Sequence, residues 1–476
     1  MKNNLFLLLV LTSFASFSQN FAGMFSNDLK NKEILAFHSL NKKNNESTLY
    51  FVNNDRIIAN RLSSSMQFKD SISTNKPSQS NKNILGNINT ENESLLFFGD
   101  DSFKSIFCLS FDFQKRNVDF KIFNFITSED KILQYFSENE KFYVLSTNKS
   151  SNKVKLTIIN ENKELNELYL ESSLDQNSND LLMNVSVNNE NINMNALKIN
   201  INSYCFYTES SKMNKAYFYN NQFILSFDSN NLYTKVIVFD LIKNSITEKN
   251  ITKTSQIPYN DIDLKSNSFL QEGKLFQIAF NKSDLVVTIK DLDNNLIKEF
   301  SSFTSDFDNV EFIKEHEIDA PNITKKRDVF LKSMANGEAG ISCYKDNNNF
   351  LISFGRAVAL VLPEEKRENS YATIGGAGGF VGALIGAIID NSSNSNKNVR
   401  SFLNNGRYYF NYSIDTNFNY VQTASNKKIG AEKLRSYLKL SDNENGSILF
   451  KIDTITYYGF YDHSEKRYFI RKFDDY

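Results

Sequence analysis

The chain has 476 residues, and its 54 Lys and Arg residues nearly balance its 55 Asp and Glu residues, so the formal net charge is −1. Proteins that bind nucleic acid need clustered positive charge to displace counterions from phosphates, so this balance argues against a DNA or RNA partner. With 41% hydrophobic residues, including 42 Phe and 22 Tyr, the chain can bury a large core, which excludes wholesale disorder.

The N-terminus has the pattern of a secretory signal peptide. Lys2 precedes an apolar run, 5–11, and a stretch rich in Ser and Ala, 13–18, follows it, so we expect cleavage after Ser18 and a mature chain of 19–476. A buried strand or a membrane anchor is the alternative, but the run is too short to span a bilayer. This leader and the heavy use of Asn and Lys resemble exported proteins of Bacteroidetes-type bacteria. The predicted location is therefore the periplasm, the outer-membrane surface or the extracellular space.

Short alternating runs rich in Phe, Tyr, Val and Ile recur along the chain, and each ends in Asn, Asp or Gly, which is typical of β-strands joined by tight turns. Two such ends usually lie about twelve residues apart, and an apolar residue that opens a third strand follows. Eight units fit this template, with the last two fitting more loosely: Asn41/Asn53, Asp100/Asp112, Asn148/Asn160, Asn188/Asn200, Asp228/Asp240, Asn281/Asp291, Gly355/Asp415 and Asp453/Asp462. The second end residues of successive units are mostly 40 to 59 residues apart in the sequence, which is close to the length of a propeller blade.

These turn-flanked strands resemble β-propellers as a class, although no blade motif of a specific propeller family is present. The resemblance implies an all-β propeller of about eight four-stranded blades, with seven possible, because radial stacking buries both faces of each sheet. The alternative is a pair of tandem β-sandwiches divided near Pro258 or Pro321, since regular strand spacing also fits sandwiches.

An insertion, 356–405, separates the two ends of the seventh unit. Its middle, 371–389, is apolar and uncharged, and its glycines are spaced so that a helix would place several of them on one packing face: Gly375, Gly378, Gly379, Gly382 and Gly386. Three interpretations stay open. The segment is a membrane-inserting or self-associating helix, a helix or loop packed on the protein or in its channel, or a mobile flap. By analogy with other propellers, a loop between second and third strands faces a ligand.

Motifs for catalysis or metal binding are missing. The three histidines, His38, His316 and His463, have no ligand spacing, and the acidic stretch 291–295 lacks the Gly and Glu that a calcium loop requires. Cys108, Cys205 and Cys343 allow at most one disulfide. We therefore expect no metal, no cofactor and no catalytic residues that the sequence can identify.

The sequence alone favours an exported, non-enzymatic binding or scaffold protein whose ligand is an unknown protein or glycan. One alternative is a propeller hydrolase or lyase acting on glycans or peptides, with acidic residues dispersed over several blades. Another is a membrane-associated assembly component tethered by segment 371–389. An enzyme would bring several carboxylates together at one mouth of the ring.

Overall fold

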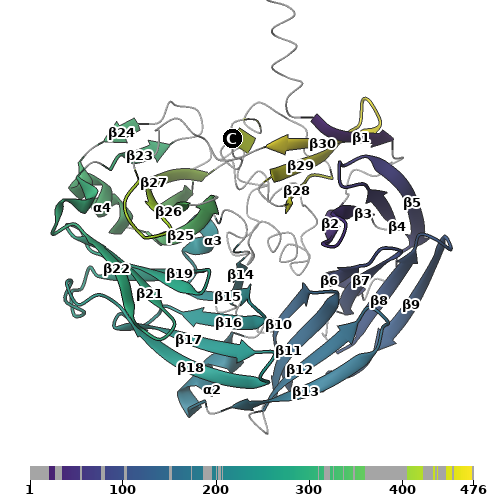
Figure 1. Ribbon diagram of the computed structural model, residues 1–476, viewed down its shortest axis with the longest axis horizontal. Helices are drawn as coiled ribbons and strands as arrows, with labels where there is room; N and C mark the ends of the chain where they lie inside the picture. The colour runs from purple at the N-terminus through teal and green to yellow at the C-terminus, as the bar shows by residue number, and fades with distance from the viewer. Residues whose placement is uncertain are drawn as a thin grey trace, which may run out of the picture.

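The structure is a computed structural model, and it is an all-β protein. It describes residues 21–26, 35–53, 56–76, 81–100, 104–148, 153–172, 174–185, 196–199, 201, 205, 207–308, 310–315, 322–324, 326–335, 337–346, 349–359, 405–421, 433–434, 437, 446–452 and 455–473. Within these ranges the strands form seven antiparallel sheets arranged around a central axis (Figure 1). The fold is a β-propeller, as the sequence predicted, and each sheet is one blade.

The first three blades each have four strands in chain order, from the axis outward. Blade 1 contains β2 (Leu35–Asn41), β3 (Glu46–Val52), β4 (Arg56–Leu62) and β5 (Phe68–Asn75). Blade 2 contains β6 (Asn81–Asn89), β7 (Glu93–Asp100), β8 (Ile106–Asp112) and β9 (Asn117–Phe123). Blade 3 contains β10 (Asp130–Glu138), β11 (Lys141–Asn148), β12 (Val154–Asn160) and β13 (Leu165–Ser172).

The next two blades differ in their inner edge. Blade 4 contains β15 (Asn214–Tyr219), β16 (Gln222–Phe227), β17 (Tyr233–Asp240) and β18 (Ser245–Thr252), and a fifth strand, β14 (Leu197–Ile199), runs parallel to β15 on its inner side. Blade 5 contains β19 (Lys265–Gln271), β20 (Lys274–Phe280), β21 (Leu285–Asp291) and β22 (Leu296–Ser301). A short parallel pairing between β13 and β18 joins the outer strands of blades 3 and 4.

Blades 6 and 7 take strands out of chain order. Blade 6 contains β25 (Gly340–Asp346), β26 (Asn349–Ala359) and β27 (Asn405–Asp415), and its outer strands, β23 (Phe312–Glu315) and β24 (Asn322–Thr324), precede them in the sequence. Blade 7 contains β28 (Ile448–Ile452), β29 (Ile455–Asp462) and β30 (Arg467–Phe473), and its outer strand is β1 (Phe21–Ser26). Because β1 pairs with β30, both ends of the described chain share one sheet, which excludes two separate sandwiches.

The helical elements whose bounds fall in the described residues are short, and they lie in the connections between strands, either between two blades or within one blade. They are α2 (Gln176–Asn184), α3 (Tyr207–Ser210), η2 (Ser305–Phe307) and α4 (Arg327–Ala335). Within the described residues, no helix is long and apolar enough to cross a membrane.

The predicted repeat units agree with the blades except for Asn188/Asn200. These two residues lie outside the described ranges, and the neighbouring strand β14 belongs to blade 4 instead of forming a blade of its own. The other units each fall in one blade, which gives seven, although Asp453 of the last unit also lies outside the described ranges and only Asp462 is placed, at the end of β29. The polar end residues recur because they shape turns: Asp112, Asp240, Asp291 and Asp462 each accept hydrogen bonds from backbone N–H groups two to four residues further on.

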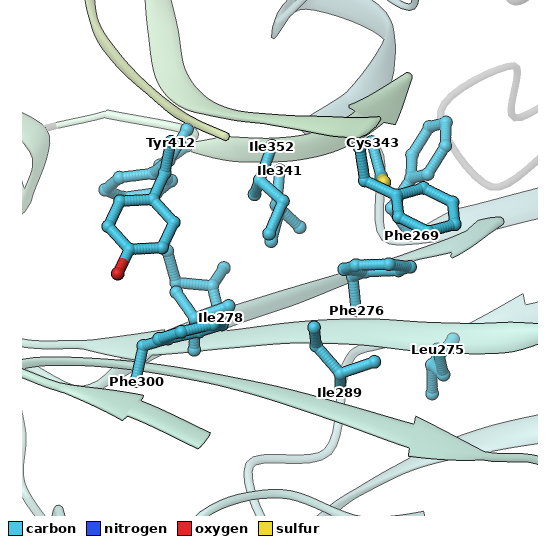
Figure 2. Close-up of a cluster of buried hydrophobic side chains, with 14 of the residues drawn as sticks. Phe269, Leu275, Phe276, Ile278, Ile289, Phe300, Ile341, Cys343, Ile352 and Tyr412 are labelled. Atoms are coloured by element: carbon cyan, nitrogen blue, oxygen red, sulfur yellow. The ribbon is translucent and has the colours of Figure 1, made fainter. Parts of the chain in front are cut away.

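The hydrophobic core lies between neighbouring blades. Figure 2 shows one such interface, where Phe276 and Ile289 of blade 5 face Ile341 and Ile352 of blade 6. Separate buried clusters fill the interfaces between blades 7 and 1, 1 and 2, 2 and 3, and 3 and 4. Middle strands such as β3, β20 and β21 are buried on both faces, and radial stacking of the blades removes both faces from water.

The insertion, predicted as 356–405, separates β26 and β27, which are the second and third strands of blade 6 as counted from the axis, and residues 356–359 and 405 belong to these two strands. Its glycines, Gly375, Gly378, Gly379, Gly382 and Gly386, and the whole apolar segment 371–389 lie outside the described residues, as does the predicted signal peptide. The packing-face, membrane and export interpretations therefore stay predictions.

Candidate functional site

The turn between β10 and β11 presents two carboxylates at the inner edge of blade 3. It is a two-residue turn in which Asn139 and Glu140 both have positive φ, 48° and 57°, which a hairpin of this type requires. Glu138 closes β10 opposite Lys141, so Glu138 and Glu140 flank Asn139. The Asn139 Nδ2 donates a hydrogen bond to Asn221 Oδ1 in the equivalent turn of blade 4, at 3.3 Å.

The turn between β2 and β3 supplies the opposite charge. Asn41 Oδ1 accepts a hydrogen bond from the Lys43 backbone N–H at 2.9 Å, which shapes the turn at its first residues. Lys42 forms an ion pair with Glu138, and Lys43 Nζ lies 2.8 Å from Glu140 Oε2. Blades 1 and 3 are not neighbours, so both lysines reach past blade 2 to make these pairs.

A third amine lies beside these pairs on β14, the innermost strand of blade 4 (Figure 1). Leu197 and Ile199 are buried in the core shared by blades 4, 5 and 6, so the alternation of a strand directs Lys198 to the opposite face, toward blade 3. Burial lowers the pKa of Lys198 to about 8, and the nearby Glu138 carboxylate opposes this shift. Within the described part of the chain, its amine forms no hydrogen bond with another residue.

Five side chains from three blades thus form what we call the hairpin cluster: Lys42, Lys43, Glu138, Glu140 and Lys198. The cluster combines ionised carboxylates and lysine cations with one amine whose pKa is low enough to give a neutral fraction near pH 7. Such an arrangement can accept a proton and can hold an anionic group. It has two carboxylates, both from one turn of blade 3, whereas the sequence-based expectation for an enzyme was several carboxylates dispersed over several blades.

A second constellation lies between blades 2 and 3. Lys163 Nζ is 3.0 Å from Ser110 Oγ and 2.8 Å from Glu93 Oε1, and Ser110 also donates a hydrogen bond to Glu93. A serine nucleophile needs a neutral base and access to substrate. Here the lysine is paired with a carboxylate and Ser110 is buried, so this group serves as an interblade contact.

A third polar group is fully buried between blades 4 and 5. Asp228 lies 3.4 Å from Lys215 Nζ and 3.6 Å from Lys253 Nζ, and it accepts hydrogen bonds from Ser268 and Thr234. Both lysines have further partners: Lys215 donates to Asn267, and Lys253 donates to Ser266 and to two backbone carbonyls. Since none of these atoms reaches solvent, the network holds blades together.

The residues considered in the sequence take no part in these sites. His38 is stacked on Phe450, His463 lies at the turn after β29, and His316 is outside the described ranges. All three cysteines are buried and none of them forms a disulfide, and burial raises the pKa of Cys108 to about 12. No group of three or more His, Cys, Asp or Glu side chains in the described part of the chain is placed to hold a metal ion.

Sequence reasoning missed the hairpin cluster. The residues of the cluster lie far apart in the sequence. Lys42 also lies in a stretch of Asn and Lys that is typical of a solvated turn. The only available signal was a glutamate at position 140, where a two-residue turn favours glycine.

Comparison with known proteins gives a limited result. No family model and no curated protein matches the chain. Among solved structures, the chain is similar to cobalt-substituted Synechocystis apocarotenoid oxygenase, with 7% identity and a TM-score of 0.31 over 58% of this chain and 63% of that one. It is likewise similar to a chimera of that oxygenase with RPE65, with 7% identity and a TM-score of 0.30 over 56% and 62%. The chain thus spans less than two thirds of the length of either structure.

The similar structures correct one expectation. They are structures of an oxygenase, which is an enzyme, and this finding contradicts the non-enzymatic binding or scaffold role expected from the sequence. At this level the similarity carries neither substrate nor mechanism to this chain.

Proposed function

We propose that this protein is an exported glycan lyase in which Lys198 is the catalytic base. The observation that carries the proposal is the position of Lys198: a partly buried amine on the innermost strand, facing blade 3 beside the Glu138 carboxylate. With a pKa of about 8, about a tenth of the Lys198 amines are neutral at pH 7. A base whose pKa lies near the working pH is efficient, because a useful fraction of it is unprotonated and it still binds a proton strongly.

The reaction is a β-elimination on a sugar that bears a carboxylate. The neutral Lys198 amine takes the proton from the carbon next to the substrate's carboxylate. The electron pair of that C–H bond forms a C=C bond as the C–O bond to the neighbouring sugar breaks, and the leaving oxygen takes a proton from water. The products are an unsaturated acidic sugar and a new chain end, and Lys198 returns its proton to solvent.

Elimination fits the cluster better than hydrolysis does. A glycosidase needs one carboxyl group that is protonated and donates its proton to the leaving oxygen. In the hairpin cluster both carboxylates are paired with lysines, which suits ionised acceptors, and the group with a shifted pKa is an amine.

The test is an elimination assay on the mature protein with polygalacturonate and alginate, following the absorbance of the new C=C bond. We expect activity from the wild type, and a kcat at least about 100-fold lower for Lys198→Met. Lys198→Arg keeps the positive charge but cannot become neutral, so it should be equally inactive. Lys115→Met, which removes an exposed lysine paired with Asp112 in another turn, is the control.

Two outcomes count against the proposal. One is the absence of unsaturated product from any acidic glycan tested with folded protein. The other is full activity in Lys198→Met.

A further inference from the structure

The two ion pairs of the hairpin cluster have an unusual exposure pattern. The side chains of Lys42 and Lys43 are 66% and 75% exposed, whereas their partners Glu138 and Glu140 are only 22% and 24% exposed. The carboxylates are therefore held by the fold, and the lysine heads reach them from the solvent side. Ion pairs that exposed lysines form with carboxylates are weak, because water and salt screen the charges. An anion from solution can therefore compete with the carboxylates for the lysines.

The backbone supports a role for Glu140 beyond turn formation. Its φ of 57° is a conformation that glycine adopts without strain and other residues adopt at a cost. The hairpin between β19 and β20 has Gly273 at the corresponding place, with φ of 72°. At position 140 the chain instead has a carboxylate that binds Lys43, and Asn139 ties the same turn to Asn221 of blade 4.

A ligand that competes for both lysines of the hairpin cluster needs more than one negative charge. Glu140 raises the pKa of Lys43, with smaller contributions from Glu161 and Glu91, so Lys43 stays a cation over the physiological range. Lys42 and Lys43 are consecutive, and each has one carboxylate partner. A ligand that replaces both partners must supply two anionic groups.

We propose that Lys42 and Lys43 are specificity residues that exchange Glu138 and Glu140 for two acidic groups of the substrate, so that the substrate is a polyanionic glycan. This inference rests on the proposed lyase function. In the exchanged state Glu138 is released from Lys42 and pairs with Lys198, where it stabilises the ammonium that forms when Lys198 takes the proton. Binding of an acidic chain thus strengthens the base that acts on it.

The experiment measures binding separately from turnover. Calorimetry with the inactive Lys198→Met protein compares polygalacturonate, monomeric galacturonate and neutral dextran at low and high salt. We expect binding of the polymer only, weakened by salt. Adding Lys42→Met and Lys43→Met should weaken it at least about tenfold, whereas adding Lys115→Met, at a similarly exposed pair, should leave it unchanged.

A second variant predicts a change in the opposite direction. Glu140→Gly removes the backbone strain of the turn and the carboxylate that binds Lys43, so the affinity for the polymer should rise. Because glycine adopts this conformation without strain, the variant should fold as well as the wild type. Equal binding of dextran, or unchanged affinity in the lysine variants, overturns the inference. Lysine-dependent polymer binding by a wild type without elimination activity leaves the inference standing and rejects the lyase function.

Discussion

His38 is a titratable side chain that the ring of blades keeps neutral. It lies on the inner strand β2, its ring stacks on Phe450 of blade 7 with centroids 3.9 Å apart, and its Nε2 forms a hydrogen bond with Ser47 Oγ at 2.9 Å. Burial lowers the pKa of His38 to about 3 from an ordinary value of 6.5. The imidazole therefore acts here as an aromatic packing group.

This shift predicts a pH dependence of folding. The unfolded chain binds a proton at His38 below pH 6.5, whereas the folded chain does so only near pH 3, so this contribution to stability is complete above pH 6.5 and is lost as the pH falls toward 3. The slope from this one group is at most about 1.4 kcal/mol per pH unit. Urea denaturation from pH 4 to 7 should show a shallower slope for His38→Gln. His463→Gln, at an exposed turn, should keep the wild-type slope.

Glu138 should control the basicity of Lys198. Its carboxylate raises the pKa of the amine against the effect of burial, so Glu138→Gln should lower that pKa further below 8. The pH profile of kcat/KM should then shift to lower pH, while Asp112→Asn, which changes a distant turn, should leave it in place. An unmoved profile in Glu138→Gln contradicts the assignment of Lys198 as the base.

At the scale of elements, the buried Asp228 network joins the strands of blades 4 and 5. Asp228→Asn removes the only carboxylate that this network gives to Lys215 and Lys253, and it leaves two buried cations uncompensated. Breaking such a group costs about 3–5 kcal/mol. Chemical denaturation at pH 7 should show this loss, and the loss should shrink at high pH, where neutral lysines need no counter-charge. The exposed turn variant Asp112→Asn should lose much less stability.

The strands and turns were predictable because their signals are local. Alternating aromatic and β-branched residues mark the strands, and the acidic or amide residue at each end accepts backbone hydrogen bonds in the turn that follows. The repeat template does not mark the same strand in every blade. Asp240 ends the third strand of blade 4, whereas Asn53 follows the second strand of blade 1.

The candidate site was not predictable, because it depends on contacts between separate turns. The sequence gives no local reason for Lys42 to meet Glu138, 96 residues away and two blades along the ring. The low pKa of Lys198 depends on β14 packing inside blade 4, and the segment before it suggested a separate blade. Only tertiary packing creates both features.

At the scale of the whole molecule, one sheet closes the ring, and Gly23 marks the tightest point of that closure. A Cβ added at Gly23 would lie 2.3 Å from the Met66 carbonyl oxygen, a backbone atom of blade 1 that cannot move aside easily. Gly23→Ala should therefore lower stability by about 1–3 kcal/mol in urea denaturation and speed proteolysis of the β1 strand. Met24→Ala, at a neighbouring residue that is 38% exposed, is the control and should change little.

The pairing of β1 with β30 also sets an order of events during synthesis. Residues 21–26 are made early, yet their partner strand, residues 467–473, is made more than 440 residues later. The β1–β30 pairing of blade 7 therefore cannot form until residues 467–473 have been released, and β1 stays an unpaired edge strand until then. Contacts so distant in sequence slow folding and leave a strand open to wrong partners. A chain interrupted before residue 467 lacks this pairing entirely, so closure of the ring depends on β30.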